Sequence, residues 1–229
     1  MNVKLFYAAI VCCFAACTAP AQTVSPIISE YTNSADGSFQ VRNDTIAPFA
    51  VVLEVRSFTV NDNGDPMYRP LDAGISVDLS AKSFRVAPHR SYTVFYRAHA
   101  FKLPAWFTIY ANIQGRPASP GLQLLIRLPH TVYLLTSSSP VRADIVVSQG
   151  QVDPLQHKVR FVLENKSSQF DRVQAVELRS FVGKQAYGGF PCFPHQKRVI
   201  LLDWNKDFPP SQVTLAFSKF RMDALFPSP

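Results

Sequence analysis

The chain has 229 residues and a formal net charge of +7. Its basic residues are dispersed, with Lys197 and Arg198 as the single adjacent pair, which argues against a nucleic-acid-binding stripe of basic and aromatic residues. Eighteen prolines and eighteen phenylalanines stand against nine glycines, and no long stretch follows a helical period. This composition argues against a helical bundle and favours an all-β protein whose strands are separated by prolines.

The first 21 residues have the features of a secretory signal peptide. Lys4 supplies a short positive region, residues 5–16 form an apolar run, and Ala19-Pro20-Ala21 is a small-residue cleavage site before Gln22. A second interpretation stays open, because residues 14–17 loosely resemble a bacterial lipobox, which would leave Cys17 lipidated. No later stretch has about 18 consecutive apolar residues, so we expect an exported protein without a membrane span.

Cleavage after residue 21 leaves 208 residues (229 − 21) and removes three of the four cysteines, so that Cys192 remains alone. An exported protein with one cysteine has no internal disulfide, and its stability must come from its cores. Because Pro191 and Pro194 flank this cysteine, we expect a buried packing residue rather than a nucleophile. The remaining length suffices for one large β domain or two smaller ones.

Short segments of alternating apolar and polar residues follow one another up to residue 136. Turn-forming residues separate them, most clearly in Asn61-Asp62-Asn63-Gly64-Asp65-Pro66. The predicted strands in this half are residues 39–42, 48–58, 77–79, 83–86, 91–97, 106–112 and 121–135. Seven or eight strands at this spacing are typical of an immunoglobulin-like sandwich.

Residues 136–140 (TSSSP) form the predicted linker, because they are small and polar and end in a proline. Further strands are predicted at residues 143–147, 157–164, 173–182, 197–202 and 212–219. Tyr187-Gly188-Gly189 is one of the predicted separators between them. The sequence therefore predicts two sandwiches of about 115 and 90 residues, with domains at residues 22–136 and 137–229 after a signal peptide at residues 1–21.

Residues 121–135 (GLQLLIRLPHTVYLL) form the longest predicted strand, and Arg127 is the one charged residue in it. One face of its first half is wholly apolar and consists of Leu122, Leu124, Ile126 and Leu128. Pro129 has no N–H for a sheet ladder, so this strand is expected at an edge or a bulge. A long apolar edge templates pairing with other chains, so either the fold covers it or its function is to offer it.

In the order of these features the chain resembles the PapD-like periplasmic chaperones of chaperone–usher pilus assembly. The matching segments run from Val24-Ser25-Pro26 through residues 39–43, 48–55 and 83–94 to the strand at 122–135. The resemblance implies two immunoglobulin-like β-sandwich domains set in an L, with a pilin held in the cleft between them. It implies a periplasmic, non-catalytic protein without a cofactor, whose partners are a pilin or another unfinished β-sandwich subunit and an outer-membrane usher.

In that family the last strand of the first domain inserts alternating apolar residues into the pilin's unfinished sandwich, a form of β-strand addition. Leu122, Leu124 and Ile126 match those positions. The candidate subunit-binding site is completed by their neighbours Leu128, Arg127 and Thr131.

The family also anchors the pilin's terminal carboxylate with an arginine and a lysine. The corresponding positions here fall near Ile28 and Thr131, which carry no charge. Arg127 and His130 are the candidate substitutes. This departure favours a divergent or non-pilus client.

The sequence contains no motif for catalysis or metal binding. Its five histidines never fall in a metal-ligand spacing with one another or with Cys192, and there is no H-E-x-x-H, no G-x-S-x-G and no phosphate-binding loop. Trp106 and Trp204 are expected in a core or at a domain interface. Two alternatives stay open: the apolar face of residues 122–128 could be ordinary core, and the protein could be an exported two-domain adhesion or structural module that binds a surface ligand.

Overall fold

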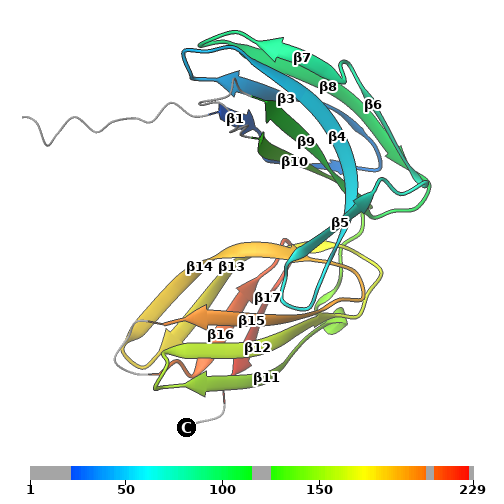
Figure 1. Cartoon of the computed structure of the whole chain (residues 1–229). Coiled ribbons are helices and arrows are strands. Elements are labelled where there is room, and N and C mark those ends of the chain that lie inside the picture. Colours follow the sequence, from blue (N-terminus) through cyan, green and yellow to red (C-terminus); the bar gives the residue numbers. More distant parts are fainter. Residues whose placement is uncertain (1–21, 115–124, 205–208, 227–229) are drawn as a thin grey trace, which may run out of the picture.

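The computed structural model describes residues 22–114, 125–204 and 209–226. These residues are almost entirely β-strand, with one short 3-10 helix, η1 (Arg142–Asp144). Two β-sandwiches follow one another along the chain and meet at an angle, so that the molecule is bent (Figure 1). The predicted fold class, all-β with two sandwiches in an L-shaped arrangement, is confirmed.

The first sandwich contains β1 to β10. One of its sheets has the strand order β1 (Gln22–Ser25), β3 (Ala35–Asn43), β8 (Ser91–Ala100) and β6 (Ile75–Leu79). The other has the order β2 (Ile28–Thr32), β10 (Leu125–Leu135), β9 (Ala105–Gln114), β4 (Phe49–Val60) and β5 (Pro66–Pro70), with β7 (Ser83–Val86) also paired to β4. Strands β2 and β10 are parallel, whereas β10 and β9 are antiparallel.

Alternate residues of these strands fill the space between the two sheets, as the period of a strand requires. The large fully buried side chains of this core are Phe39, Val41, Val51, Val94, Tyr96, Phe107, Ile109, Ile113, Val132 and Leu134. Each contributes about 1.5–3 kcal/mol through burial. With no disulfide in the described part of the chain, this apolar burial is what holds the sandwich together.

The second sandwich contains β11 to β17. Its three-stranded sheet has the order β11 (Ile145–Asp153), β12 (Lys158–Asn165) and β15 (Lys197–Asp203). Its four-stranded sheet has the order β14 (Gly183–Cys192), β13 (Asp171–Ser180), β16 (Gln212–Ala216) and β17 (Arg221–Leu225). Phe161, Leu163, Val173, Leu178, Val213 and Leu215 are among the buried residues of its core.

Strand β14 corrects the sequence analysis, which took Tyr187-Gly188-Gly189 for a separator. These residues lie inside the strand, where Tyr187 and Gly188 pair with Val176 and Ala175 of β13. A Cβ at Gly189 would overlap the carbonyl oxygen of Val173, so glycine here permits a close approach of two backbones rather than a turn. Strands β5 and β17, each five residues long, were not predicted from the sequence.

Both sandwiches use one buried asparagine in the same way. Asn43 ends β3 and its side chain donates to the carbonyls of Ala47 and Val86 while it accepts from Thr45. Asn165 ends β12, donates to Gln169 and accepts from Ser167. Each amide replaces backbone partners that the chain loses where it leaves the sheet, as buried polar groups demand.

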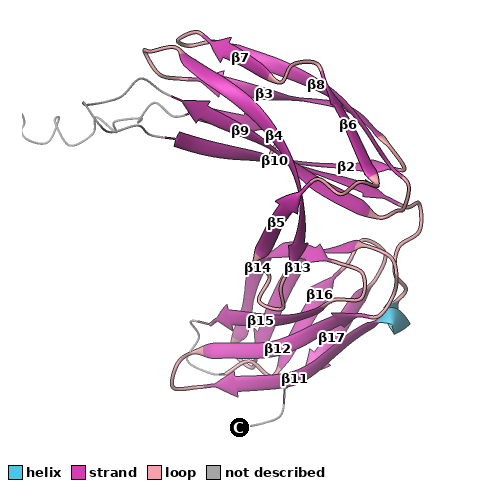
Figure 2. Ribbon diagram, turned by 45° about the vertical axis from the view of Figure 1, so that its right-hand side comes forward, coloured by secondary structure: helices cyan, strands magenta, loops and turns pink. Residues whose placement is uncertain are grey.

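An aromatic cluster joins the two sandwiches. Phe58 and Tyr133 of the first sandwich are buried against Phe170 and Phe193 of the second, with Trp106 packed beside them. The β4–β5 hairpin also reaches the second sandwich (Figure 2), where the carbonyl of Asp62 accepts a hydrogen bond from the N–H of Val199 at 2.7 Å. Trp106 therefore lies at the interface between the sandwiches and Trp204 in the core of the second sandwich, and both positions agree with the prediction.

Candidate functional site

The outer edge of β10 is only half covered. On its inner side β10 pairs with β9 along almost its whole length, from Leu125 to Leu134. On its outer side β2 pairs with residues 131–135 alone. Within the described part of the chain, the segment Leu125 to His130 therefore has a free edge, which we call the open segment of β10.

The open segment presents unpaired backbone groups at every second residue. The N–H of Thr131 donates outward to the carbonyl of Ile27 at 2.7 Å, so residues of the same parity, Leu125, Arg127 and Pro129, also direct their backbone groups outward. Pro129 is tolerated because its missing N–H belongs to this free side and not to the ladder with β9. The predicted edge position of this strand thus holds for residues 125–130.

The two faces of the open segment differ, as the alternation predicted. Ile126 and Leu128 are half-buried and pack against the core of the first sandwich. Leu125, on the opposite face, is 54% exposed. The face of Ile126 and Leu128 thus continues the core toward the open edge. Leu122 and Leu124, the other predicted members of this face, lie outside the described residues.

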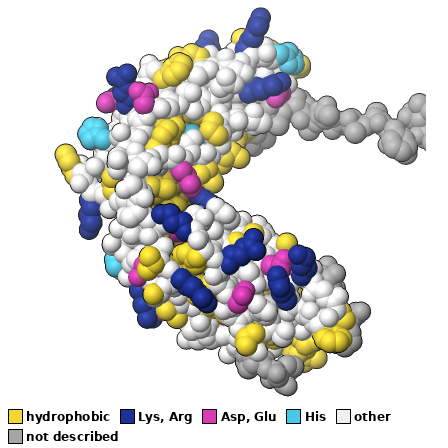
Figure 3. Space-filling model, turned by 180° about the vertical axis from the view of Figure 1, so that it is seen from behind, with side chains coloured by type: hydrophobic (Ala, Val, Ile, Leu, Met, Phe, Trp, Pro, Cys, Tyr) yellow, Lys and Arg dark blue, Asp and Glu magenta, His cyan; other side chains and the backbone are white. Residues whose placement is uncertain are grey.

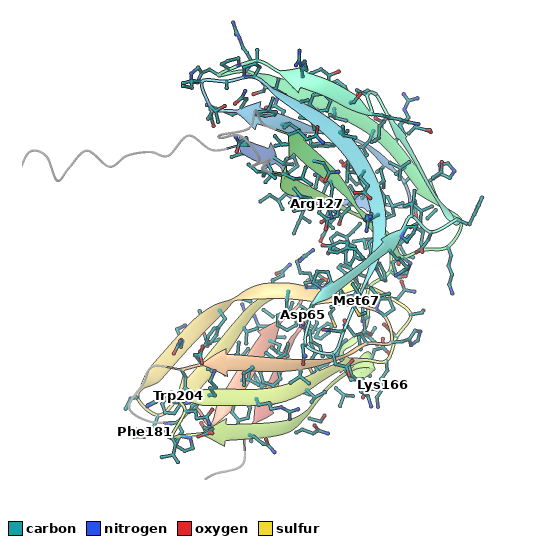
Figure 4. All side chains as sticks on the ribbon, in the orientation of Figure 1. Asp65, Met67, Arg127, Lys166, Phe181 and Trp204 are labelled. Carbon is teal, nitrogen blue, oxygen red and sulfur yellow. The ribbon has the colours of Figure 1, made fainter. Side chains whose placement is uncertain are left out.

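Arg127 is held by its own sheet. Its Nε donates to Asn112 at 2.9 Å, its guanidinium lies 5.1 Å from the centre of the Tyr110 ring, and Glu54 is 3.7 Å away. A hydrogen bond from Arg56, with the nearby charge of Arg127, holds the pKa of Glu54 below its usual value. Arg127 lies on the side of the first sandwich that faces the second (Figure 4), and it shares the Glu54 carboxylate with Arg56.

Ile28 and Thr131, the two positions where the resembled family carries its anchor, are directly paired in the register of β2 and β10. Neither is charged, and the hydroxyl of Thr131 contacts that of Thr108 at 3.2 Å. Two residues further along, Tyr133 pairs with Glu30. The two anchor positions of the resembled family therefore lie side by side on β2 and β10, and neither carries a charged side chain.

Arg172 of β13, in the second sandwich, reaches Glu30 of β2 in the first. Its Nε and Nη2 both donate to Glu30, at 2.9 and 2.6 Å, and its guanidinium lies 5.4 Å from the centre of the Tyr133 ring. Arg172 was not among the residues predicted from the sequence to form the site. Because Glu30 and Arg172 are 142 residues apart, no local pattern could have brought them together.

His130, the other candidate substitute, does not face the second sandwich. Its side chain is fully buried in the first sandwich, where it stacks on Phe39 and bonds to the Pro26 carbonyl at 2.7 Å and to the Tyr96 hydroxyl at 3.0 Å. Burial lowers the pKa of its imidazole, although the Pro26 carbonyl acts against this. His130 is therefore a neutral structural group, which ties the start of β2 to β10.

A notch lies between the two sandwiches, open to solvent on one side (Figure 3). Hydrophobic side chains gather on the wall that the first sandwich contributes, and acidic and basic side chains lie near the vertex (Figure 3). The open segment of β10 belongs to this first-sandwich wall. An extended segment of a second protein could pair with it there.

The described residues offer no group of three or more histidines, cysteines or carboxylates that could hold a metal ion. Cys192 is buried, as predicted, and burial together with the neighbouring Asp171 carboxylate raises the pKa of its thiol to about 12. A thiol that stays protonated is a poor nucleophile. None of the helices in the described part of the chain has the length and apolarity that a membrane crossing requires.

Comparison with solved structures places the fold. The class 5 fimbrial chaperone CfaA matches with a TM-score of 0.56 and 13% identity, over 91% of this chain and all of its own (100%). The E. coli chaperone DraB matches with a TM-score of 0.52 and 16% identity, over 90% and 99% of the two chains. A chain from the complex of the Salmonella enterica SafA pilin with the SafB chaperone matches with a TM-score of 0.54 and 10% identity, over 90% and 96%. Scans of the sequence against protein-family models and curated proteins gave no match.

Proposed function

We propose that this chain, which has the two-domain fold of the PapD-like fimbrial chaperones, is itself a chaperone that holds pilin or pilin-like subunits. The observation that carries the proposal is the open segment of β10, whose free backbone edge adjoins an apolar face continuous with the core. A subunit that lacks one strand of its sandwich can pair with that edge and take the apolar side chains into its own groove.

Leu122, Leu124 and Ile126 are the side chains that we assign to the groove of the subunit, with Leu128 next to them. Each contributes about 1.5–3 kcal/mol if the subunit buries it. Arg127 and Thr131 flank the segment on its other face. Since Ile28 and Thr131 are uncharged, binding in this protein depends on strand pairing and apolar burial rather than on a charged anchor at that place.

Two variants on opposite faces of the open segment test the proposal. Ile126→Arg places a charge where the subunit has an apolar groove, and the affinity for a co-expressed pilin subunit should fall at least a hundredfold, or about 2.7 kcal/mol. Leu125→Arg adds the same charge one residue away on the exposed face and should change the affinity less than fivefold. Affinities are measured by titration of the purified complex components.

Because Ile126 also packs against the core, thermal melts accompany both variants. If Ile126→Arg unfolds, Leu124→Arg replaces it with the same expected loss of affinity. A variant that melts like the wild type and retains its subunit would refute strand donation through this face. Equal losses in the two face variants would show that the added charge, and not the apolar groove, is responsible.

We further propose that the protein is exported to the periplasm, where an outer-membrane usher would be its second partner. The predicted cleavage site precedes Gln22, and Gln22 is the first residue of β1, paired with Asn43. The intact mass of the exported protein should correspond to a chain that begins at Gln22. A lipid-modified species that begins at Cys17 would contradict this and support the lipobox interpretation.

A further inference from the structure

A cavity of about 440 Å³ opens between the free edges of β14 and β15 in the second sandwich. Its walls are mainly apolar, with Val176 and Phe190 on one sheet and Ile200 and Leu202 on the other. At one end Gln185 and Tyr187 bond to the carbonyl of Asp203. At the other end the β4–β5 turn covers Val199. We call this partly open gap the β14–β15 slot.

Arg198 stands at the end of the slot next to the β4–β5 turn. Arg198 pairs with Leu163, a core residue, in the ladder of β15 and β12. Its side chain therefore lies on the core side of this sheet. Its guanidinium lies 4.4 Å from the centre of the Phe190 ring, and Nη1 donates to the Pro191 carbonyl at 3.4 Å. Its Nε is buried and has no hydrogen-bond partner among the described residues.

The described lining of the slot carries positive charge and no negative charge. The described lining includes two arginines, Arg160 and Arg198, and no carboxylate. No ion pair between described residues involves Arg198. Burial lowers the pKa of its guanidinium, and the more distant Asp65 carboxylate opposes this only in part. A partly buried cation without a directly bonded counter-ion is costly, and an anion placed beside it would recover part of that cost.

We propose that the β14–β15 slot binds a small amphipathic carboxylate, with its head group on Arg198 and its apolar chain along Ile200 and Leu202. The planar guanidinium fork matches a carboxylate better than other anions of that size. The volume falls within the range of small-molecule sites, about 300–1,000 Å³. The site lies in the second sandwich and does not depend on how β10 binds a subunit.

Calorimetric titration of the full exported chain, with no subunit present, tests the proposal with three ten-carbon probes below their micelle concentrations. Decanoate should bind with saturation at one molecule per chain. Decanol, which has the same chain without the charge, should bind at least tenfold more weakly, and decyltrimethylammonium should not bind. Absence of saturable decanoate binding, or equal affinity for decanol, would overturn the proposal.

A matched pair of variants locates the site. Arg198→Gln should weaken decanoate binding at least tenfold and leave decanol binding unchanged. Lys197→Gln removes the same charge from the neighbouring residue, whose side chain is 64% exposed and lies 3.8 Å from Glu164, and should change decanoate binding less than twofold. If Arg198→Gln unfolds, Leu202→Trp keeps the arginine and fills the slot, and it should abolish binding. Wild-type affinity in whichever of these two variants folds would overturn the assignment.

Discussion

Protonation of His130 should make the stability of this protein fall as the pH is lowered. The Pro26 carbonyl can only accept, so Nδ1 carries the proton and Nε2 accepts from the Tyr96 hydroxyl. Tyr96 then receives a hydrogen bond from Tyr31, whose hydroxyl is 2.9 Å away. A second proton on the ring would turn Nε2 into a donor, reverse this chain and bury a charge without a counter-ion.

The direction and size of the effect follow from proton linkage. Burial lowers the pKa of His130 in the folded state below the ordinary value of 6.5, so the unfolded chain binds the extra proton first. Stability is therefore complete above pH 6.5 and decreases as the pH falls through and below that value. One proton gives a slope of at most about 1.4 kcal/mol per pH unit, so the loss at pH 5 is at most about 2 kcal/mol relative to the stability at pH 8.

Urea denaturation between pH 5 and 8 measures this slope. His130→Gln keeps a donor for Pro26 and an acceptor for Tyr96 but does not titrate. The pH dependence of its free energy of unfolding should therefore be smaller than that of the wild type by up to one proton. Its free energy of unfolding should also be lower by a nearly constant amount, because glutamine does not stack on Phe39 as the imidazole does. His99→Gln removes an exposed histidine of β8 and serves as the matched control, with the wild-type slope expected. Wild-type pH dependence of His130→Gln between pH 5 and 6.5 would show that His130 is not the group whose protonation lowers the stability.

Two further predictions concern the second sandwich and its connection to the first. Gly189→Ala should lower the free energy of unfolding by at least about 2 kcal/mol, because its Cβ would overlap the Val173 carbonyl oxygen. Gly188→Ala, with no atom within 4 Å of its Cβ, should stay within about 0.5 kcal/mol, and equal losses in chemical denaturation would contradict the close approach. Limited proteolysis should cut within residues 136–140, where Ser137 and Ser138 are exposed, and leave fragments of about 115 and 90 residues. A resistant chain without a cut there would argue against this domain boundary.

Much of the fold is encoded locally and was predictable from the sequence. Alternation of apolar and polar residues identified β4 and β8, because the side chains of a strand face opposite sides of its sheet in turn. The turn after β4 and the polar segment 136–140 separated the strands and suggested two units. The apolar face of residues 122–128 also follows from alternation, and its described members Ile126 and Leu128 do lie on one side of β10.

The rest depended on contacts between distant segments. The same two glycines that indicate a turn in the sequence form part of β14, because the opposing Val173 carbonyl comes too close for any side chain at Gly189. Alternation identifies the two faces of β10 but cannot say which face is buried, and the sheet directs His130 inward. The open segment exists because β2 pairs with residues 131–135 and begins no earlier. The contact between Glu30 and Arg172 arises only when two sandwiches, each folded around its own core, meet at their aromatic interface.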